Sequence, residues 1–397
     1  MVQTRERGGT PRVFRNIGRH AMMADTSHDE AAREDFIATM YYAVQSELFL
    51  GNKLAYESRV LPEFVRQNDR PPMDRHEIRH AMEDAPEYQW WSSLRRTTQE
   101  MKQNTGEEMV ARQIGDLVER AKPRENASGS LRLDPNIAIP RYLTAVDFHG
   151  QPGGYLAERT ENDVTSAAIY DPGVYVLTKG FMGPYCEAAG ATVINYLKRE
   201  RPDFAPKRIL DMGCSVGHST LPYADAYPGA FLHAIDLAAP MLRYAHARAE
   251  SMGVAVHFSQ QNAEQTNYPD ASFDLVVSHI VLHETSRKAL PRIVAECRRL
   301  LRPGGVMIHL EQRQHTGMGA FEQFIYDWDT LNNNEPYWGA LHDTQVADIA
   351  VAAGFDRARV VEATVPNVVA ADMFKTQIGD GKDFKRTSEW FLFGAER

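Results

Sequence analysis

The stretch ILDMGCSVGHST, residues 209–220, has residue types and spacing that suit a small-cofactor site. An apolar run typical of a buried strand delivers Asp211, and a turn built on Gly213 and Gly217 leads into a helix. Glycines are needed where the backbone turns tightly and lets a ligand approach the main chain. No lysine follows Gly217 as in a P-loop, and the glycine spacing differs from the GxGxxG dinucleotide motif. A ligand without a phosphate suits this loop best.

An acidic residue follows the next apolar run. The segment FLHAID ends in Asp236, about 20 residues beyond the glycine loop. A carboxylate at this place can accept hydrogen bonds from both ribose hydroxyls of an adenosine. The alternative is that Asp236 caps the helix that begins near Pro240. The joint occurrence of loop, spacing and acid favours the ribose role.

Histidine and glutamate side chains follow two later strands, in SHIVLHETS and HLEQRQH. Ligands bind beyond the carboxyl ends of strands in open α/β sheets, so these loops should face the reacting group. The expected catalytic residues are His283, Glu284 and Glu311, as general bases. His283 could instead be a hydrogen-bonded structural histidine, and Glu284 a first-turn acid of the next helix. His279 and His283 are spaced like a zinc pair without a clear third ligand, so we expect no metal.

The elements that must position these residues alternate between strands and helices after Pro206, which is typical of a parallel α/β sheet. The expected strands cover residues 208–212, 231–236, 254–259, 273–278, 306–311, 358–364 and 390–394. The expected helices cover residues 240–252 and 286–302. The stretch 366–387 between the last two strands is long enough to form a lid.

The first half of the chain has a helical pattern. Apolar residues recur every four positions from Phe36 to Leu48, and a second apolar face runs from Val110 to Ala121. The expected division is a disordered tail over residues 1–28, a helical domain over 29–125, a connector and active-site cover over 126–190, and the α/β domain over 191–397. The helical domain is either a cap over the site or a dimerisation unit.

Charge and cysteine content narrow the class of protein. The 397 residues carry a formal net charge of −9, whereas nucleic-acid binding requires a positive surface. Three cysteines without a CxxC pair argue against a disulfide framework or a structural zinc site, and they fit a reducing compartment. No apolar run reaches the roughly 18 residues of a membrane helix. We expect a cytoplasmic protein without a membrane span.

Residues 207–312 resemble the class I S-adenosylmethionine-dependent methyltransferases, most closely the branch of ubiquinone and menaquinone C-methyltransferases. The motifs that carry the resemblance are LDMGCSVGHST, AIDLAAPML, QNAEQTNYPDASFDLVVS and LLRPGGVMIHLE, in that order. The resemblance implies a Rossmann-like α/β fold with a seven-stranded sheet, helices on both faces and an antiparallel last strand. It also implies S-adenosylmethionine as the cofactor. The N-terminal half carries no such resemblance.

The same motifs supply the expected binding residues. Those for the cofactor are Asp211, Gly213, Cys214, Ser215, Gly217, Asp236, Leu237, Asn262, Ala263 and His279. The family often has aspartate where Asn262 stands, and the amide carbonyl can still accept a hydrogen bond from an adenine amino group. Side chains expected to contact the substrate are Tyr175, Tyr185, His315 and Tyr326. Aromatic faces among them could also attract a sulfonium cation.

The expected function is methyl transfer to a small-molecule acceptor. The [DNS]PP[YFW] element of amino-methylating nucleic-acid enzymes is replaced by SHIVLHE, and no cysteine follows a proline as cytosine C5 methylation requires. We expect no nucleic-acid partner, and a homodimer formed through the N-terminal helices. The alternatives are a dinucleotide-dependent oxidoreductase and a protein that binds S-adenosylmethionine without transferring its methyl group.

Overall fold

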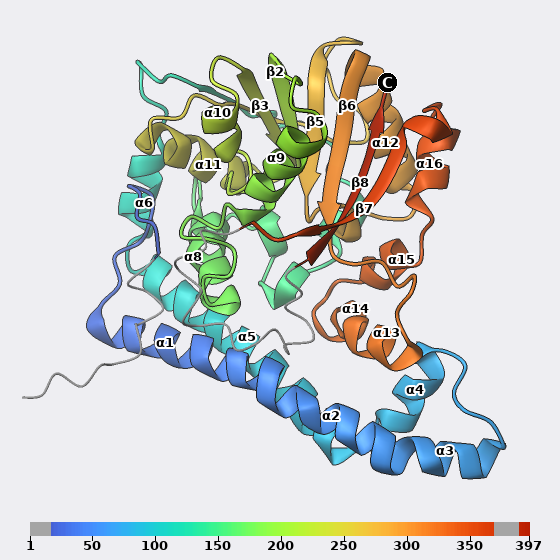
Figure 1. Ribbon diagram of the computed structural model, residues 1–397. Coiled ribbons are helices and arrows are strands. Elements are labelled where there is room, and N and C mark those ends of the chain that lie inside the picture. The colour runs from blue at the N-terminus through green and yellow to red at the C-terminus, as the bar shows by residue number, and fades with distance from the viewer. Residues whose placement is uncertain (1–16, 369–388) are drawn as a thin grey trace, which may run out of the picture.

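The computed structural model describes residues 17–368 and 389–397, and its centre is an eight-stranded sheet (Figure 1). The strands are β1 (Ser130–Arg132), β2 (Arg208–Met212), β3 (Phe231–Asp236), β4 (His257–Gln260), β5 (Phe273–His279), β6 (Leu301–Glu311), β7 (Val360–Pro366) and β8 (Glu389–Glu396). Their order is β1-β4-β3-β2-β5-β6-β8-β7. Only β8 runs antiparallel to its neighbours, so the expected antiparallel last strand is confirmed.

The sheet has one strand more than the seven that were expected. The additional strand β1 lies in the connector and pairs in parallel with β4, with Leu131 opposite Phe258. Directly before it, Gly129 comes so close to Val256 that a Cβ atom would lie 2.2 Å from that residue's carbonyl oxygen. The sequence did not predict this strand because three residues at a sheet edge are too few for a recognisable alternation.

Helices cover both faces of the sheet, as expected (Figure 1). Alternate strand residues face opposite sides, so Ile209 and Leu275 belong to one core and Leu210 and Val276 to the other. The first face packs against α9 (Ala188–Glu200), α10 (Pro222–Ala226) and α11 (Ala239–Ser251). The second face packs against α12 (Ala289–Leu300) and α16 (Val346–Ala352). Burial on both faces explains why these strands are continuous apolar runs.

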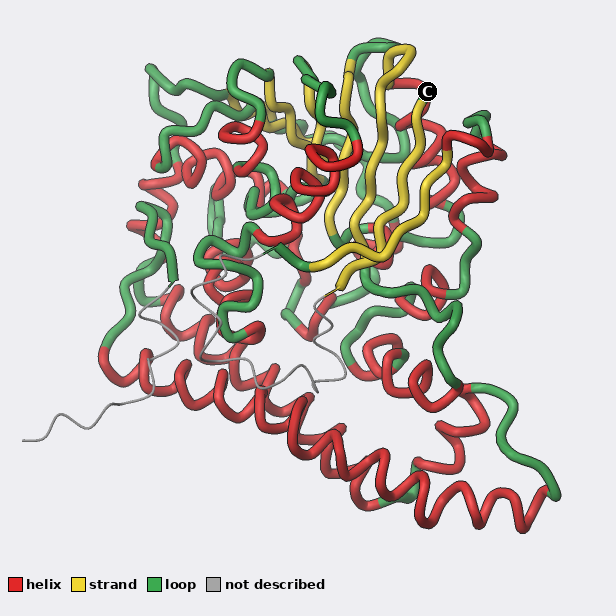
Figure 2. Tube along the Cα trace, in the orientation of Figure 1, coloured by secondary structure: helices red, strands yellow, loops and turns green. Residues whose placement is uncertain are grey.

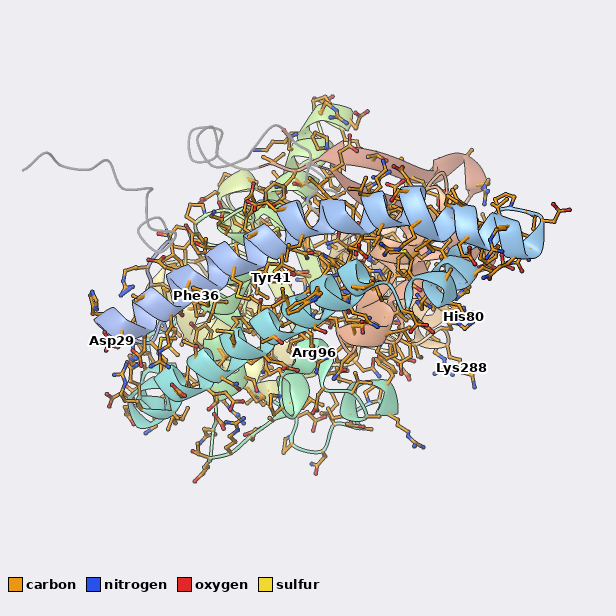
Figure 3. The ribbon with its side chains drawn as sticks, turned by 90° about the horizontal axis from the view of Figure 1, so that it is seen from below. Asp29, Phe36, Tyr41, His80, Arg96 and Lys288 are labelled. Atoms are coloured by element: carbon orange, nitrogen blue, oxygen red, sulfur yellow. The ribbon has the colours of Figure 1, made fainter. Side chains whose placement is uncertain are left out.

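The N-terminal helices form a layer below the carboxyl ends of the parallel strands (Figures 1 and 2). The helical layer consists of α1 (His28–Ala43), η2 (Val44–Leu48), α2 (Phe49–Ala55), η3 (Tyr56–Val60), α3 (Leu61–Asn68), α4 (Arg75–Met82), α5 (Pro86–Ala111) and α6 (Ile114–Ala121). A capping box starts α1, because Ser27 accepts from the backbone of Glu30 while the Glu30 carboxylate accepts from that of Ser27. Seen from below, α1 to α3 and α5 run side by side (Figure 3).

The remaining helices lie in the connector and in the loops of the α/β domain. They are α7 (Arg141–Thr144), η4 (Phe148–Gly150), η5 (Gly154–Leu156), α8 (Thr165–Thr178), η6 (Leu282–Glu284), α13 (Ala320–Tyr326), α14 (Trp328–Asn332), α15 (Trp338–His342) and η7 (Arg357–Arg359). Buried Arg95 of α5 forms an ion pair of 2.6 Å with Asp329 of α14, and its guanidinium lies 3.7 Å from the ring centre of Trp328. This contact fixes the helical layer to the segment that follows β6.

The described part of the expected tail is packed rather than free. The backbone N–H of Gly18 donates to the carbonyl of Pro184 at 2.7 Å, and Met22 is buried. The expectation of a disordered tail is therefore wrong for residues 17–28. Residues 1–16 lie outside the described residues, as does the expected lid from residue 369 onward.

A buried carboxylate on α8 connects three parts of the chain. One oxygen of Asp171 accepts from His218 at 2.6 Å, and the other lies 2.8 Å from His20 and 2.7 Å from the Tyr244 hydroxyl. Arg248 of α11 lies 3.7 Å away and is 1% exposed. Burial by itself would raise the pKa of Asp171, but the neighbouring cation and imidazoles hold it well below its usual value.

Replacing Asp171 by asparagine should lower the free energy of unfolding by about 3–5 kcal/mol, because Arg248 then stays buried without a counter-charge. Urea denaturation followed by circular dichroism measures this. The control is Asp348→Asn, which breaks an exposed ion pair with Arg357 and should leave stability nearly unchanged. A shift below about 1 kcal/mol in Asp171→Asn would show that this carboxylate does not hold α8 in place.

Candidate active site

Two adjoining cavities lie at the carboxyl ends of the strands. The loop cavity, of about 180 Å³, is lined by the glycine loop and by residues that follow β3, β4 and β5. The helix cavity, of about 300 Å³, is lined by α1, α5, α8 and the α13–α15 segment. The two cavities share the wall residues Tyr170, Val174, Met182, Ile280 and Glu284. A ligand in one cavity therefore faces a ligand in the other across this shared wall.

The glycine loop forms the floor of the loop cavity. Gly213 has a φ of +74°, and a Cβ atom there would lie 2.7 Å from Val281, so only glycine fits. The Ser215 hydroxyl lines the cavity, buried and without a hydrogen-bond partner. Gly217 also has a positive φ, of +79°, but does not line the cavity. It shapes the turn, so its expected contact with the cofactor is not found.

Asp236 lies at the end of β3 and lines the same cavity. Its carboxylate accepts hydrogen bonds of 2.9 Å from the backbone N–H groups of Ser215 and Ala238. Burial raises the pKa of Asp236 to about 6 despite these hydrogen bonds. The bond to Ala238 closes a turn before α11, whose N-cap residue is Ala238 and has no side-chain cap hydrogen bond, so the alternative that Asp236 caps this helix is not found.

The other expected cofactor residues also line the loop cavity. They are Asp211, Cys214, Leu237, Asn262, Ala263 and His279. Asp211 and His279 hold each other, since their side chains lie 3.3 Å apart, and Tyr223 lies 3.1 Å from the other ring nitrogen of His279. The Asn262 carbonyl accepts from the backbone of Glu264 at 2.9 Å, which leaves one lone pair for a ligand.

The loop after β5 is held by Glu311. One oxygen of Glu311 accepts from the backbone N–H groups of Val281 and Leu282, at 2.9 and 2.6 Å, and the other lies 2.7 Å from His283 Nδ1. Glu311 lines neither cavity, so it positions the loop and the geometry does not support its expected catalytic role. Burial would lower the pKa of His283, but Glu311 outweighs it and raises the pKa to about 9. A protonated His283 cannot accept a proton at neutral pH.

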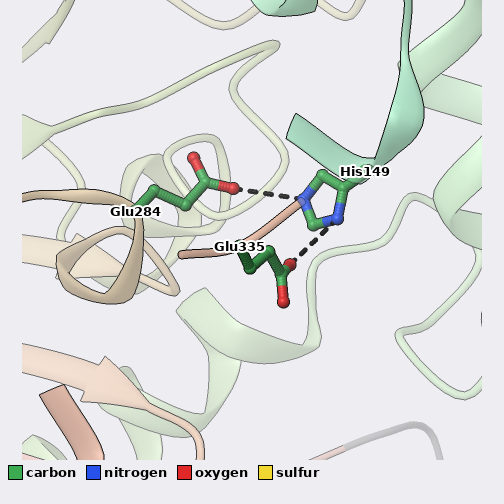
Figure 4. A group of neighbouring side chains, drawn as sticks. All are labelled: His149, Glu284 and Glu335. Carbon is green, nitrogen blue, oxygen red and sulfur yellow. Dashed lines mark hydrogen bonds and ion pairs between the residues drawn. The ribbon is translucent and has the colours of Figure 1, made fainter. Parts of the chain in front are cut away.

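Glu284 belongs to a cluster with His149 and Glu335 (Figure 4). Nε2 of His149 lies 3.1 Å from the Glu284 carboxylate, and Nδ1 lies 2.9 Å from that of Glu335. The Tyr155 hydroxyl donates to the same Glu284 oxygen at 2.8 Å. Burial lowers the pKa of His149, yet the two carboxylates raise it to about 10. An imidazolium between two carboxylates leaves the cluster with one net negative charge.

The same cluster contains ligand types that a divalent cation could use. Its ligand atoms, one from each of the three side chains, lie within 4.8 Å of one another. Each His149 nitrogen points at a carboxylate, so the ring is held as the imidazolium, and a metal would have to displace a proton to bind. The geometry thus favours an ion-paired cluster over a metal centre, and the expected absence of metal stays a prediction.

The structure places one of the four expected substrate residues in the helix cavity. Tyr326 lines it, and its hydroxyl donates to Gln312 at 3.1 Å. Tyr175 is packed into the core on the other side of α8, Tyr185 covers Gly18, and His315 bonds Asp343 at 3.0 Å. The predictions for these three residues are wrong in position. Sequence proximity to the glycine loop does not determine which face of α8 carries Tyr175, nor which way the loops of Tyr185 and His315 turn.

Several residues of the helix cavity were not predicted. They include His149 and Glu335 of the cluster and Arg95, Gln99, Lys102 and Gln103 of α5. The four α5 residues fall on one helix face by their spacing. That signal was available, but polar residues at helical spacing more often mark a solvated face.

The comparisons with known proteins agree with this geometry. Residues 209–305 match a family model described as a methyltransferase domain. A demethylmenaquinone methyltransferase of Thermus thermophilus is 36% identical over 107 residues, which are 27% of this chain and 48% of the relative. A malonyl-[acyl-carrier protein] O-methyltransferase of Methylococcus capsulatus is 37% identical over 103 residues, which are 25% of this chain and 35% of the relative.

Solved structures show a more distant likeness. A phosphoethanolamine N-methyltransferase 2 of Haemonchus contortus, in complex with S-adenosyl-L-methionine, is 19% identical and has a TM-score of 0.40. That match covers 58% of this chain and 57% of the other. The chain spans less than half the length of the two curated relatives described above. The family match shows a methyltransferase domain over residues 209–305, and a quinone methyltransferase is among the relatives that this region resembles.

Replacing Asp236 by alanine should weaken S-adenosylmethionine binding by about 1–3 kcal/mol, because charge-assisted hydrogen bonds to the ribose are lost. Calorimetry at several pH values measures this. In the unchanged protein the affinity should fall as the pH drops through about 6, since protonation removes the negative charge of Asp236. The pH dependence should disappear in Asp236→Ala. Equal affinities for both proteins would contradict the ribose assignment.

Proposed function

We propose that this protein is an S-adenosylmethionine-dependent methyltransferase whose small-molecule acceptor occupies the helix cavity. The observation that carries the proposal is the shared wall, on which Glu284 lines both cavities. The cofactor belongs in the loop cavity, beside the motifs of the methyltransferase domain. The acceptor then lies below it, enclosed by the helical layer.

The loop cavity fits the cofactor by its own chemistry. The Asp236 carboxylate offers acceptors to a ribose, and the unpartnered Ser215 hydroxyl is free to bond a polar group of the ligand. Because Gly213 has no side chain, a ligand on the floor of the cavity can approach the main chain there. A dinucleotide is disfavoured, because the loop lacks the third glycine of the phosphate-binding motif.

When bound beside Gly213, Ser215 and Asp236, S-adenosylmethionine would supply an electrophilic methyl group to the acceptor's lone pair, and its sulfur would keep the electrons of the carbon–sulfur bond. Glu284 accepts the proton that the acceptor's nucleophilic atom releases. His149 and Tyr155 both bond one oxygen of the Glu284 carboxylate and so orient it. The second oxygen accepts the proton from the methyl acceptor. The net negative charge of the cluster attracts the cofactor's cation. The helical layer excludes water from the reacting groups.

The change Glu284→Gln should lower turnover by about 100-fold or more while the affinity for S-adenosylmethionine stays within a few-fold, because the shape is kept and the base is lost. Single-turnover kinetics and calorimetry measure the two quantities separately. Glu322→Gln on α13 is the control, since Glu322 pairs with Arg313 and lines neither cavity. Wild-type turnover in Glu284→Gln would place the base elsewhere.

The activity itself is tested by incubating the protein with methyl-deuterated S-adenosylmethionine and a metabolite extract. We expect mass spectrometry to find a small molecule that carries a trideuteromethyl group, and Asp236→Ala to yield much less of it at limiting cofactor. If calorimetry shows cofactor binding but no molecule is labelled, the alternative of binding without methyl transfer is supported.

The cellular setting and the assembly belong to the same proposal. All three cysteines are free and buried, which fits a reducing cytoplasm. No helix among the described residues is long and apolar enough to cross a membrane. The expected homodimer stays a prediction, for which the exposed Phe36 and Leu54 of the helical layer offer apolar surface. The expected absence of a nucleic-acid partner also stays a prediction.

A further inference from the structure

We infer that the acceptor is an organic anion whose carboxylate is bound by Lys102 and Gln103 on α5. That the bound anion is the methyl acceptor rests on the proposed function, whereas the anion site itself follows from the residues of the helix cavity. Both side chains line that cavity and lie next to each other on the helix that closes it from below. None of the motifs of the methyltransferase domain includes them.

Lys102 is a cation without a counter-charge. Its ammonium group faces the helix cavity, and no described carboxylate pairs with it. Gly173 of α8 leaves room for it, because a Cβ atom at Gly173 would lie 3.2 Å from Nζ of Lys102. Removal from water lowers the pKa of Lys102 to about 8. A desolvated ammonium is stabilised most by an anion that enters beside it.

Gln103 adds a second unsatisfied group to the lining of the same cavity. The side chain is 3% exposed, and neither its amide nitrogen nor its carbonyl oxygen has a hydrogen-bond partner. A buried polar group without a hydrogen-bond partner is unfavourable in a folded protein, so a native site of this kind calls for a ligand. The ammonium and the amide N–H together offer donors to the two oxygens of one carboxylate. The amide carbonyl remains for a hydroxyl or N–H of the same ligand.

The neighbouring residues of the α5 face have partners to different degrees. Arg95 forms an ion pair with Asp329 through one nitrogen, whereas its Nε and Nη1 atoms are buried without a hydrogen-bond partner. Gln99 donates to the backbone carbonyl of His149 at 2.7 Å. The carboxylates of Glu284 and Glu335 share His149 as their cation. Among the described α5 residues that line the helix cavity, Lys102 is the cation without an ion-pair partner, and Gln103 adds a buried amide without a hydrogen-bond partner, so these two residues offer donors to an anion.

The charge and the walls of the cavity narrow the ligand class. One unpaired ammonium matches one negative charge, whereas a phosphate dianion would leave a charge uncompensated in a partly desolvated site. Val174, Leu177 and Phe181 of the α8 region present an apolar wall to the same space. The acceptor inferred from these walls has a carboxylate at one end, an apolar middle and a nucleophilic atom directed towards Glu284.

The test compares two probes of nearly equal shape, 3-phenylpropionate and 3-phenylpropionamide, with the full protein saturated with S-adenosylhomocysteine. Calorimetry should show that the carboxylate binds at least about 10-fold more tightly than the amide. Lys102→Met should remove this preference, and Lys102→Arg should keep most of it. Gln103→Leu should weaken the binding of 3-phenylpropionate and leave the binding of 3-phenylpropionamide unchanged. Lys53→Met, on the exposed side of α2, is the matched control and should change nothing.

The inference is overturned if neither probe binds, if the two probes bind equally to the unchanged protein, or if the preference survives in Lys102→Met. If 2-phenylethyl phosphate binds more tightly than 3-phenylpropionate, the site is one for a phosphate ester and the inferred carboxylate is wrong. In the labelling experiment, an acidic labelled product supports the inference and a neutral or cationic one contradicts it. Failure of the proposed function would be visible separately, as loss of S-adenosylhomocysteine binding or absence of any labelled product, while the probe comparison still decides the anion site.

Discussion

The buried carboxylate of Asp171 is the contact on which the arrangement of the site depends. It joins α8 to His218 of the glycine-loop region, to Tyr244 and Arg248 of α11, and to His20 near the start of the described chain. Its neighbour in sequence, Tyr170, lies in the wall between the two cavities. Because one buried ion holds α8, the wall between the two cavities keeps a fixed place.

That wall separates two cavities with different chemistry. The loop cavity presents backbone groups, small side chains and the Asp236 carboxylate. Such a lining suits a polar cofactor that is recognised by its shape and by hydrogen bonds. The helix cavity combines an apolar α8 surface with buried charges, most of which are already paired. The cluster of His149, Glu284 and Glu335 therefore gives the reacting end a net negative charge, and Lys102 gives the opposite charge to the α5 wall.

The helical layer completes the site instead of standing apart from it. Its α5 helix lines the helix cavity and is fixed to the segment after β6 by the Arg95–Asp329 ion pair. Of the two roles expected for these helices, the cap is the one that the cavity lining supports. Dimerisation remains compatible with it, since a cap uses the inner face of the layer and a dimer would use the outer face.

The sequence by itself determined the α/β domain and the cofactor site. Seven strands and the residues from Asp211 to His279 could be predicted because each function depends on a contiguous strand, turn and helix. Only the tertiary structure decided the site that we propose for the acceptor. His149, Glu284 and Glu335 come from three distant segments, and Lys102 is one of many polar residues on a long helix. Which helix face is buried depends on packing between segments, and the helical spacing of polar residues does not by itself distinguish a cavity lining from a solvated face.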